Sequence, residues 1–144
     1  MNLSPHFTLE ELTRSQYAAR KGLSNDPDDS IIANLKRLAA LLEQVRAEIG
    51  KPIIVTSAYR SPAVNAGIGG SKNSQHMFGC AADIRALSMS PDDLMLSITS
   101  SDIKYDQLIR EFDSWVHISV PNRPDLKPRM QRLIIDKEGT RAYS

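Results

Sequence analysis

The chain has 144 residues, of which 41% are hydrophobic, with 18 Lys and Arg against 17 Asp and Glu. This length is typical of one domain, and the composition excludes disorder, collagen and coiled coil as descriptions of the whole chain. The formal charge of +1 argues against a dedicated nucleic-acid binder, and the single cysteine excludes an intrachain disulfide and a cysteine-based zinc knuckle. We therefore expect one domain over residues 1–144 and no nucleic-acid partner, and we take a monomer as the default.

The N-terminal third of the chain predicts two helices. The residues Thr8–Glu11 fit a capping box, which predicts a short helix that continues to about Arg20. Residues 22–29 are rich in Gly, Asn, Pro and Asp and predict a loop. Apolar residues then recur at helical spacing over Ser30–Ile49, and Gly50 predicts the end of this second helix.

The remainder of the chain predicts a sheet with one more helix. Ser61–Ser74 is rich in Gly, Ser and Asn and predicts a loop, whereas Ser90 and Pro91 predict a helix start. The predicted strands are Ile53–Thr56, Ala81–Ile84, Gln107–Glu111, Trp115–Val120 and Arg132–Ile135. This order predicts an α+β fold, in which N-terminal helices pack on a small, mainly antiparallel sheet.

No targeting or membrane segment is expected. No run of about 18 apolar residues exists, so we expect no membrane insertion. The first residues lack a basic stretch followed by an apolar one, so we expect synthesis in the cytoplasm without a signal peptide. Action outside the cytoplasm would then require release or delivery.

Two of the three histidines lie in informative settings, whereas His6 is expected at the surface. His76 closes the Gly-rich loop, and Asp83 follows inside a strand of small and apolar residues. A carboxylate in such a strand needs a partner, because an unpaired buried charge is costly. A bound cation fits this requirement, and so does an arginine or a set of backbone donors.

The third histidine, His117, lies at the centre of a predicted strand. Alternation places Trp115, His117 and Ser119 on one face and the apolar residues on the other, which predicts that His117 faces a groove or solvent. A half-buried histidine with a backbone partner is the alternative. If His76, Asp83 and His117 converge, they supply three ligands for a tetrahedral zinc ion with the fourth position open, the pattern of a catalytic site.

The same residues carry a resemblance to a known family. The pattern Ser-x-His-x-x-Gly-x-Ala-x-Asp over Ser74–Asp83, followed by Trp115–Ser119, resembles the signature of the zinc D-Ala-D-Ala carboxypeptidase family. That family includes D-Ala-D-Ala dipeptidases and L-Ala-D-Glu-type peptidoglycan endopeptidases. Upstream, Thr56–Asn65 resembles the Ser-x-Tyr-Arg-Ser segment of the family. The resemblance covers about residues 3–120.

The short, single-domain branch found in phages and prophages is the branch that the sequence resembles most. An opening similar to Phe7–Leu12 and a run similar to Gly69–Ser71 recur in that branch. The resemblance implies a hedgehog/D-Ala-D-Ala peptidase-like fold with the zinc site on the sheet.

The resemblance also implies roles for individual residues. His76, Asp83 and His117 would hold Zn²⁺, and Arg60 would bind a carboxylate or peptide carbonyl of the substrate. A salt bridge that ties its loop to the body is the alternative for Arg60. The other substrate-binding candidates, for which packing is the alternative, are Ser74, Gln75, Tyr59 and Trp115.

The general base is a choice between two acids. Many members of the family have Glu or Asp three residues before the last histidine, where this chain has Ser114. Glu111 lies six residues before His117, a spacing that resembles the related hedgehog zinc domain, and Asp113 lies four residues before it. A turn between the two strands would let Glu111 face His117 across a hairpin, so we prefer Glu111 over Asp113.

These observations predict zinc-dependent hydrolysis of peptide bonds in peptidoglycan stem peptides, by a carboxypeptidase or endopeptidase of phage or prophage origin that acts on the cell wall. Two alternatives stay open: a non-catalytic zinc-binding module, such as a phage-particle component, and a zinc hydrolase with another substrate. The last 24 residues carry six basic residues against three acids. This excess fits a solvated edge strand and tail, or approach to an anionic wall.

Overall fold

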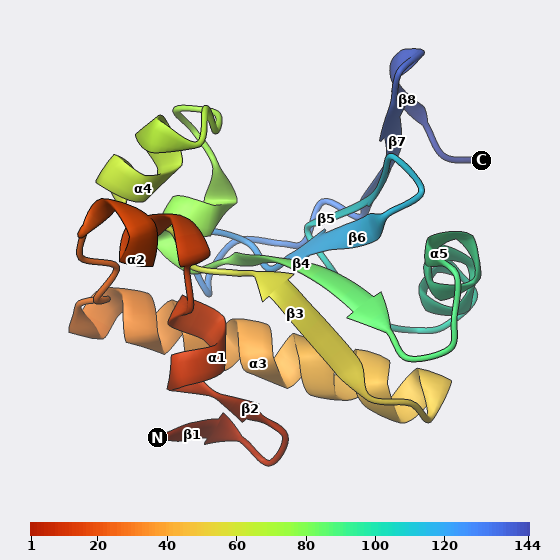
Figure 1. Ribbon diagram of the computed structural model, residues 1–144. Helices are drawn as coiled ribbons and strands as arrows, with labels where there is room; N and C mark the ends of the chain where they lie inside the picture. The colour runs from red at the N-terminus through yellow and green to blue at the C-terminus, as the bar shows by residue number, and fades with distance from the viewer.

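The computed structural model describes residues 1–144 as one six-stranded sheet, a two-stranded sheet and several helices (Figure 1). The helices are α1 (Leu9–Thr13), α2 (Gln16–Lys21), α3 (Asp29–Ile49), α4 (Pro62–Gly67), the 3₁₀ helix η1 (Gln75–Phe78) and α5 (Pro91–Thr99). The strands are β1 (Asn2–Ser4), β2 (Phe7–Thr8), β3 (Ile53–Ser57), β4 (Ala81–Ala86), β5 (Gln107–Glu111), β6 (Trp115–Ser119), β7 (Gln131–Asp136) and β8 (Gly139–Ala142). None of the helices has the length and apolar character required to cross a membrane.

The main sheet has the strand order β3-β4-β6-β5-β7-β8. Every neighbouring pair is antiparallel except β5 and β7, which are parallel. The predicted α+β fold, with helices on a mainly antiparallel sheet, is therefore confirmed. The β7–β8 hairpin projects beyond the rest of the sheet and carries the C-terminus (Figure 1).

One hydrophobic core joins α3 and α5 to one face of the sheet. Its fully buried side chains include Leu38 and Leu42 of α3, Leu94 of α5, and Ile84 and Ile118 of the central strands. Burial of each such side chain contributes about 1.5–3 kcal/mol, so this packing fixes which face of the sheet points inward. Residues at the alternate positions of β4, β6 and β5 point to the opposite face.

The expected helix from Thr8 to Arg20 is wrong, because two short helices replace it. The chain is extended at Arg14, and the Ser15 side chain then caps α2 by accepting a hydrogen bond from the Ala18 backbone N–H. A serine can satisfy the free backbone N–H groups at a helix start, which makes this position a new beginning rather than a helix interior.

The predicted loop over Ser61–Ser74 also contains regular structure. Ser61 caps α4, and Pro62 occupies its first turn, a position where the missing backbone N–H of proline costs nothing. The buried Asn65 side chain donates to the Ser71 carbonyl oxygen at 2.9 Å and so ties the following turn to this helix. These contacts give the segment before η1 a fixed path.

Candidate metal centre

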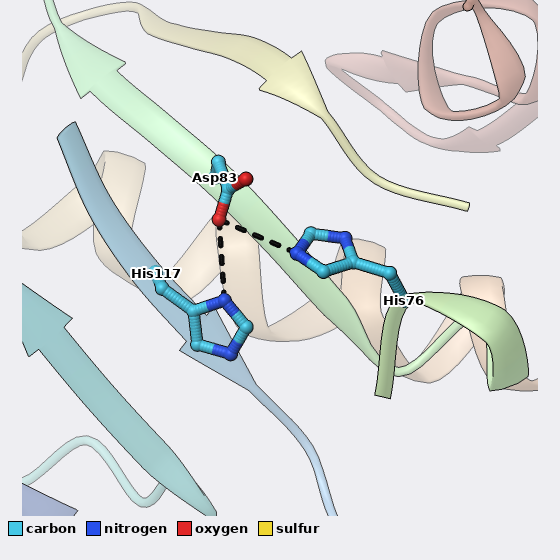
Figure 2. A group of neighbouring side chains, drawn as sticks. All are labelled: His76, Asp83 and His117. Carbon is cyan, nitrogen blue, oxygen red and sulfur yellow. Dashed lines mark hydrogen bonds and ion pairs between the residues drawn. The ribbon is translucent and has the colours of Figure 1, made fainter. Parts of the chain in front are cut away.

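The register of the central strands brings two of the predicted ligands together. Asp83 of β4 and His117 of β6 are direct cross-strand partners on the face of the sheet opposite the core. The distance from His117 Nδ1 to Asp83 Oδ1 is 3.1 Å (Figure 2). Convergence of these two side chains therefore follows from strand pairing.

The third ligand reaches the same point from η1. Gly79 ends this helix with a φ of +73°, and a side chain there would approach Ile31 to 3.0 Å. Only glycine combines this conformation with such close packing, which allows the chain to turn directly from η1 into β4. His76 then lies over the strand, with Nε2 3.4 Å from Asp83 Oδ1 (Figure 2).

The orientation of His76 shows why a cation fits between these groups. Its Nδ1 lies 2.7 Å from the Ala58 carbonyl oxygen, which can only accept, so Nδ1 carries the ring proton and Nε2 presents its lone pair to Asp83. Burial lowers the pKa of His76 and so favours the neutral ring. Because a lone pair and a carboxylate repel each other, a positive ion between them relieves the conflict.

The electrostatics of Asp83 favour its ionised form. Burial alone would raise the pKa of Asp83, but its contact with His117 holds that pKa well below the ordinary value. Arg60 Nη2 lies 3.4 Å from Asp83 Oδ2, and Arg60 Nε donates to Ser57 Oγ at 3.2 Å. Arg60 thus contacts one oxygen of this carboxylate, and the two histidines contact the other.

The cluster opens into a cavity of about 790 Å³. Nearly all the predicted site residues line it. Those residues are His76, Asp83, His117, Arg60, Glu111, Ser74, Gln75 and Trp115. A predominantly polar cleft of this size can accept a short peptide segment.

Glu111 is held in this cleft by its cross-strand neighbour. Glu111 of β5 pairs with Trp115 of β6, and its Oε2 accepts a hydrogen bond from the Trp115 indole N–H. Burial raises the pKa of Glu111, and the negative charge of Asp83 adds to the effect. A fixed carboxylate whose proton affinity is raised is suited to accept and release a proton.

Asp113, the other predicted acid, is not brought to the cluster. Phe112 and Asp113 both have positive φ, at 53° and 51°, the geometry of a type I′ hairpin turn. This turn leaves the Asp113 side chain 77% exposed, paired with Arg110 Nε at 3.3 Å and lining a different hollow. The alternative of Asp113 as general base therefore does not fit the geometry.

Tyr59 lies outside the cleft, whereas Gln75 borders the cleft and also binds protein groups. Tyr59 is buried in the core and lines another hollow of the surface instead of the cleft. Gln75 borders the cleft, but its Nε2 donates to Asp106 Oδ2, the Val120 carbonyl oxygen and Asn122 Oδ1. Its amide N–H groups therefore hold the segment next to His76 in place.

Sequence reasoning missed Asp106, which anchors part of the cleft. Its carboxylate is almost fully buried, accepts the Gln75 amide at 3.0 Å, and accepts Arg129 Nη2 at 2.7 Å. A lone aspartate before a strand resembles an ordinary turn residue, so no sequence signal marked it. The other cleft residues that sequence reasoning did not single out are Ser71, Asn73, Gln107, Ile109, Pro121, Asn122, Leu126, Lys127 and Arg129.

The residues of this cluster lie within the part of the chain that matches a known protein family. A sequence model of the Peptidase M15 family matches residues 5–119. The zinc D-Ala-D-Ala carboxypeptidase of Streptomyces albus G is 34% identical over 84 residues, which cover 56% of this chain. The aligned region covers 31% of that protein, so this chain matches about a third of the relative's length.

The identity of the ion follows from the family and from the donor set. The family and the name of the relative imply zinc. Two imidazole nitrogens and one carboxylate oxygen are ligands that zinc accepts, and the three donor atoms lie within 4.8 Å of one another. The site thus fits one zinc ion, and the chain belongs to the Peptidase M15 family.

Proposed function

We propose that this chain is a zinc-dependent peptidase, with a single catalytic domain over residues 1–144, that hydrolyses peptide bonds in peptidoglycan stem peptides. The reaction would be of the D-Ala-D-Ala carboxypeptidase or endopeptidase type. The observation that carries the proposal is the convergence of His76, Asp83 and His117 in a cleft that also holds the Glu111 carboxylate. The name of the Streptomyces relative supports the substrate class.

The chemistry divides between the ion and the side chains around it. Zinc, when bound, supplies Lewis acidity that polarises a carbonyl and makes water more acidic. Glu111, which lines the same cleft, would accept the proton of the attacking water and pass it to the leaving amine. The hydrogen bond from Trp115 fixes which direction the Glu111 carboxylate faces.

Arg60 is the residue best suited to position the substrate. Its guanidinium uses one N–H on Ser57 and another on Asp83, which holds the side chain against the sheet. The remaining N–H groups can donate to a peptide carbonyl or a terminal carboxylate, a geometry that a lysine would not reproduce. Ser74 and Trp115 line the same cleft and would contact the rest of the peptide.

The biological setting is part of the same proposal. The similarities of Phe7–Leu12 and Gly69–Ser71 to the short phage and prophage branch support an origin there. The place of action would be the cell wall, and the working form would be a monomer.

The test is digestion of purified sacculi, followed by mass spectrometry of the released fragments. The wild type should release peptide fragments whose masses identify the bond that is cut, and a chelator should stop the release. Glu111→Gln should retain zinc and lose hydrolysis, whereas Glu138→Gln, a matched change at an exposed position of the β7–β8 turn, should behave as wild type. A zinc-loaded wild type that cuts no bond over a range of pH would instead support a non-catalytic zinc-binding module.

A further inference from the structure

The cleft has a second wall, formed by residues Pro121–Arg129, which follow β6 and lie beyond the matched range 5–119. This wall is fixed at both ends. At its start, Arg37 Nη2 donates to the Pro121 carbonyl oxygen at 2.8 Å. At its end, the Arg129 guanidinium and backbone N–H both bind the buried Asp106 carboxylate. A substrate in the cleft therefore meets a wall whose position is set by the fold.

The charges in the cleft leave one cation without an acidic partner. The charged residues that line it, apart from the histidines, are Arg60, Lys127, Arg129, Asp83, Asp106 and Glu111. Arg60 pairs with Asp83 and Arg129 pairs with Asp106. Glu111 accepts the indole N–H of its neighbour, whereas Lys127 forms no ion pair and no side-chain hydrogen bond.

We propose that Lys127 binds a carboxylate of the peptide substrate, one that lies away from the scissile bond, and that it selects peptides with a free carboxylate there. This inference rests on the proposed peptidase function and adds a determinant of specificity to it. The Lys127 ammonium is exposed and stands on a fixed wall, so no ion pair within the protein has to be broken when it binds a carboxylate. Stem peptides with γ-linked D-Glu carry a free α-carboxylate at that residue, which is absent when the group is a carboxamide.

The test uses two synthetic stem pentapeptides that differ only in this group, as α-carboxylate or as carboxamide. Wild type should cleave the carboxylate peptide with a kcat/KM about three- to tenfold higher than that for the carboxamide peptide. The difference should come mainly from a lower KM, as expected for a partly screened ion pair. Lys127→Met should lose the preference by slowing only the carboxylate peptide, and Lys127→Arg should retain it. Lys137→Met, a matched change in the turn between β7 and β8, should leave both rates unchanged.

The outcomes separate this inference from the function on which it rests. A wild type that cleaves neither peptide contradicts the proposed function. Equal cleavage of both peptides by wild type, or equal slowing of both by Lys127→Met, would overturn the role of Lys127 and leave the peptidase intact. Higher salt should reduce the preference of wild type, because screening weakens an exposed ion pair, and should leave the ratio of the two rates unchanged in Lys127→Met.

Discussion

The two walls of the cleft are built by different means. The wall that carries Asp83, His117 and Glu111 is part of the sheet, where strand register determines which side chains meet. The wall over Pro121–Arg129 has no regular structure and is fixed by side-chain contacts such as that of Arg129 with Asp106. The reacting groups thus stand on regular secondary structure, whereas Lys127, the proposed determinant of specificity, stands on a connecting segment that side-chain contacts hold in place.

The largest effect is expected from loss of a ligand in the sheet wall. His117→Ala should reduce hydrolysis to the background rate. This loss should exceed the ~10–100-fold that is typical when a residue hydrogen-bonded to a metal ligand is replaced. The reason is that two donors cannot hold the ion against water. His6→Ala is the matched control, because His6 lies at the surface and contacts Glu43 instead of the cluster. Comparable loss in both variants would contradict the assignment.

The second effect separates the two acids near the hairpin. Glu111→Gln should reduce kcat by about 10²–10⁴-fold, the range for loss of a positioned general base, while zinc content stays at the wild-type level. Asp113→Asn should stay within about twofold of wild type, because its side chain is exposed and lines another hollow. Rates and zinc analysis on the same preparations give both results. A larger loss of kcat in Asp113→Asn than in Glu111→Gln would assign the general base to Asp113 instead.

A smaller effect is expected from the support of Glu111. Trp115→Phe removes the indole N–H that the carboxylate accepts and should lower kcat by about three- to tenfold. That hydrogen bond lowers the pKa of Glu111, so its loss should raise this pKa further and move the acid limb of the pH–kcat profile to higher pH. If Trp115→Phe leaves the acid limb of the pH–kcat profile unchanged, Glu111 is not the group whose titration produces that limb.

The smallest effect is expected at the anchor of the second wall, and it is an effect on the stability of the fold. Arg129→Ala should destabilise the fold by about 1–2 kcal/mol, a modest figure because the arginine side chain is 57% exposed and the ion pair is screened. Burial alone would raise the pKa of Asp106, but its hydrogen bonds with Arg129 hold it below the ordinary value of 3.8.

The sign of the pH dependence follows from that depressed pKa. The ion pair stabilises the fold above pH 3.8 and loses this contribution as the pH falls through the lower pKa of folded Asp106. The difference in unfolding free energy between wild type and Arg129→Ala, measured in urea, should therefore narrow in acid. A difference that stays constant from neutral pH into strong acid would exclude the ion pair as its source.

The sequence predicted the sheet wall better than the second wall for a physical reason. Alternation along Trp115–Ser119 is a local property, and it sufficed to place His117 on the face opposite the core. The choice between Glu111 and Asp113 depended on a type I′ turn at Phe112 and Asp113. The sequence Phe-Asp does not predict such a turn, because type I′ turns typically have the sequence Asn-Gly.

Long-range contacts were beyond the reach of pattern reasoning. Asp106 and Arg129 are 23 residues apart, and no spacing rule links an aspartate before one strand to an arginine before another. The same holds for the contact of Arg37 with Pro121, at a separation of 84 residues. The break at Ser15 was missed because the capping residue lay inside a stretch of otherwise good helix formers.

The most direct test of the account is titration of chelator-stripped protein with zinc, with X-ray absorption spectroscopy of the product. We predict uptake of one zinc per chain, with two imidazole nitrogens at about 2.0–2.1 Å and oxygen ligands in the remaining positions. Asp83→Ala and His76→Ala should each abolish tight uptake, whereas His6→Ala should not change it. A folded wild type that takes up no zinc, or cluster variants that bind zinc as tightly as wild type, would contradict the central claim.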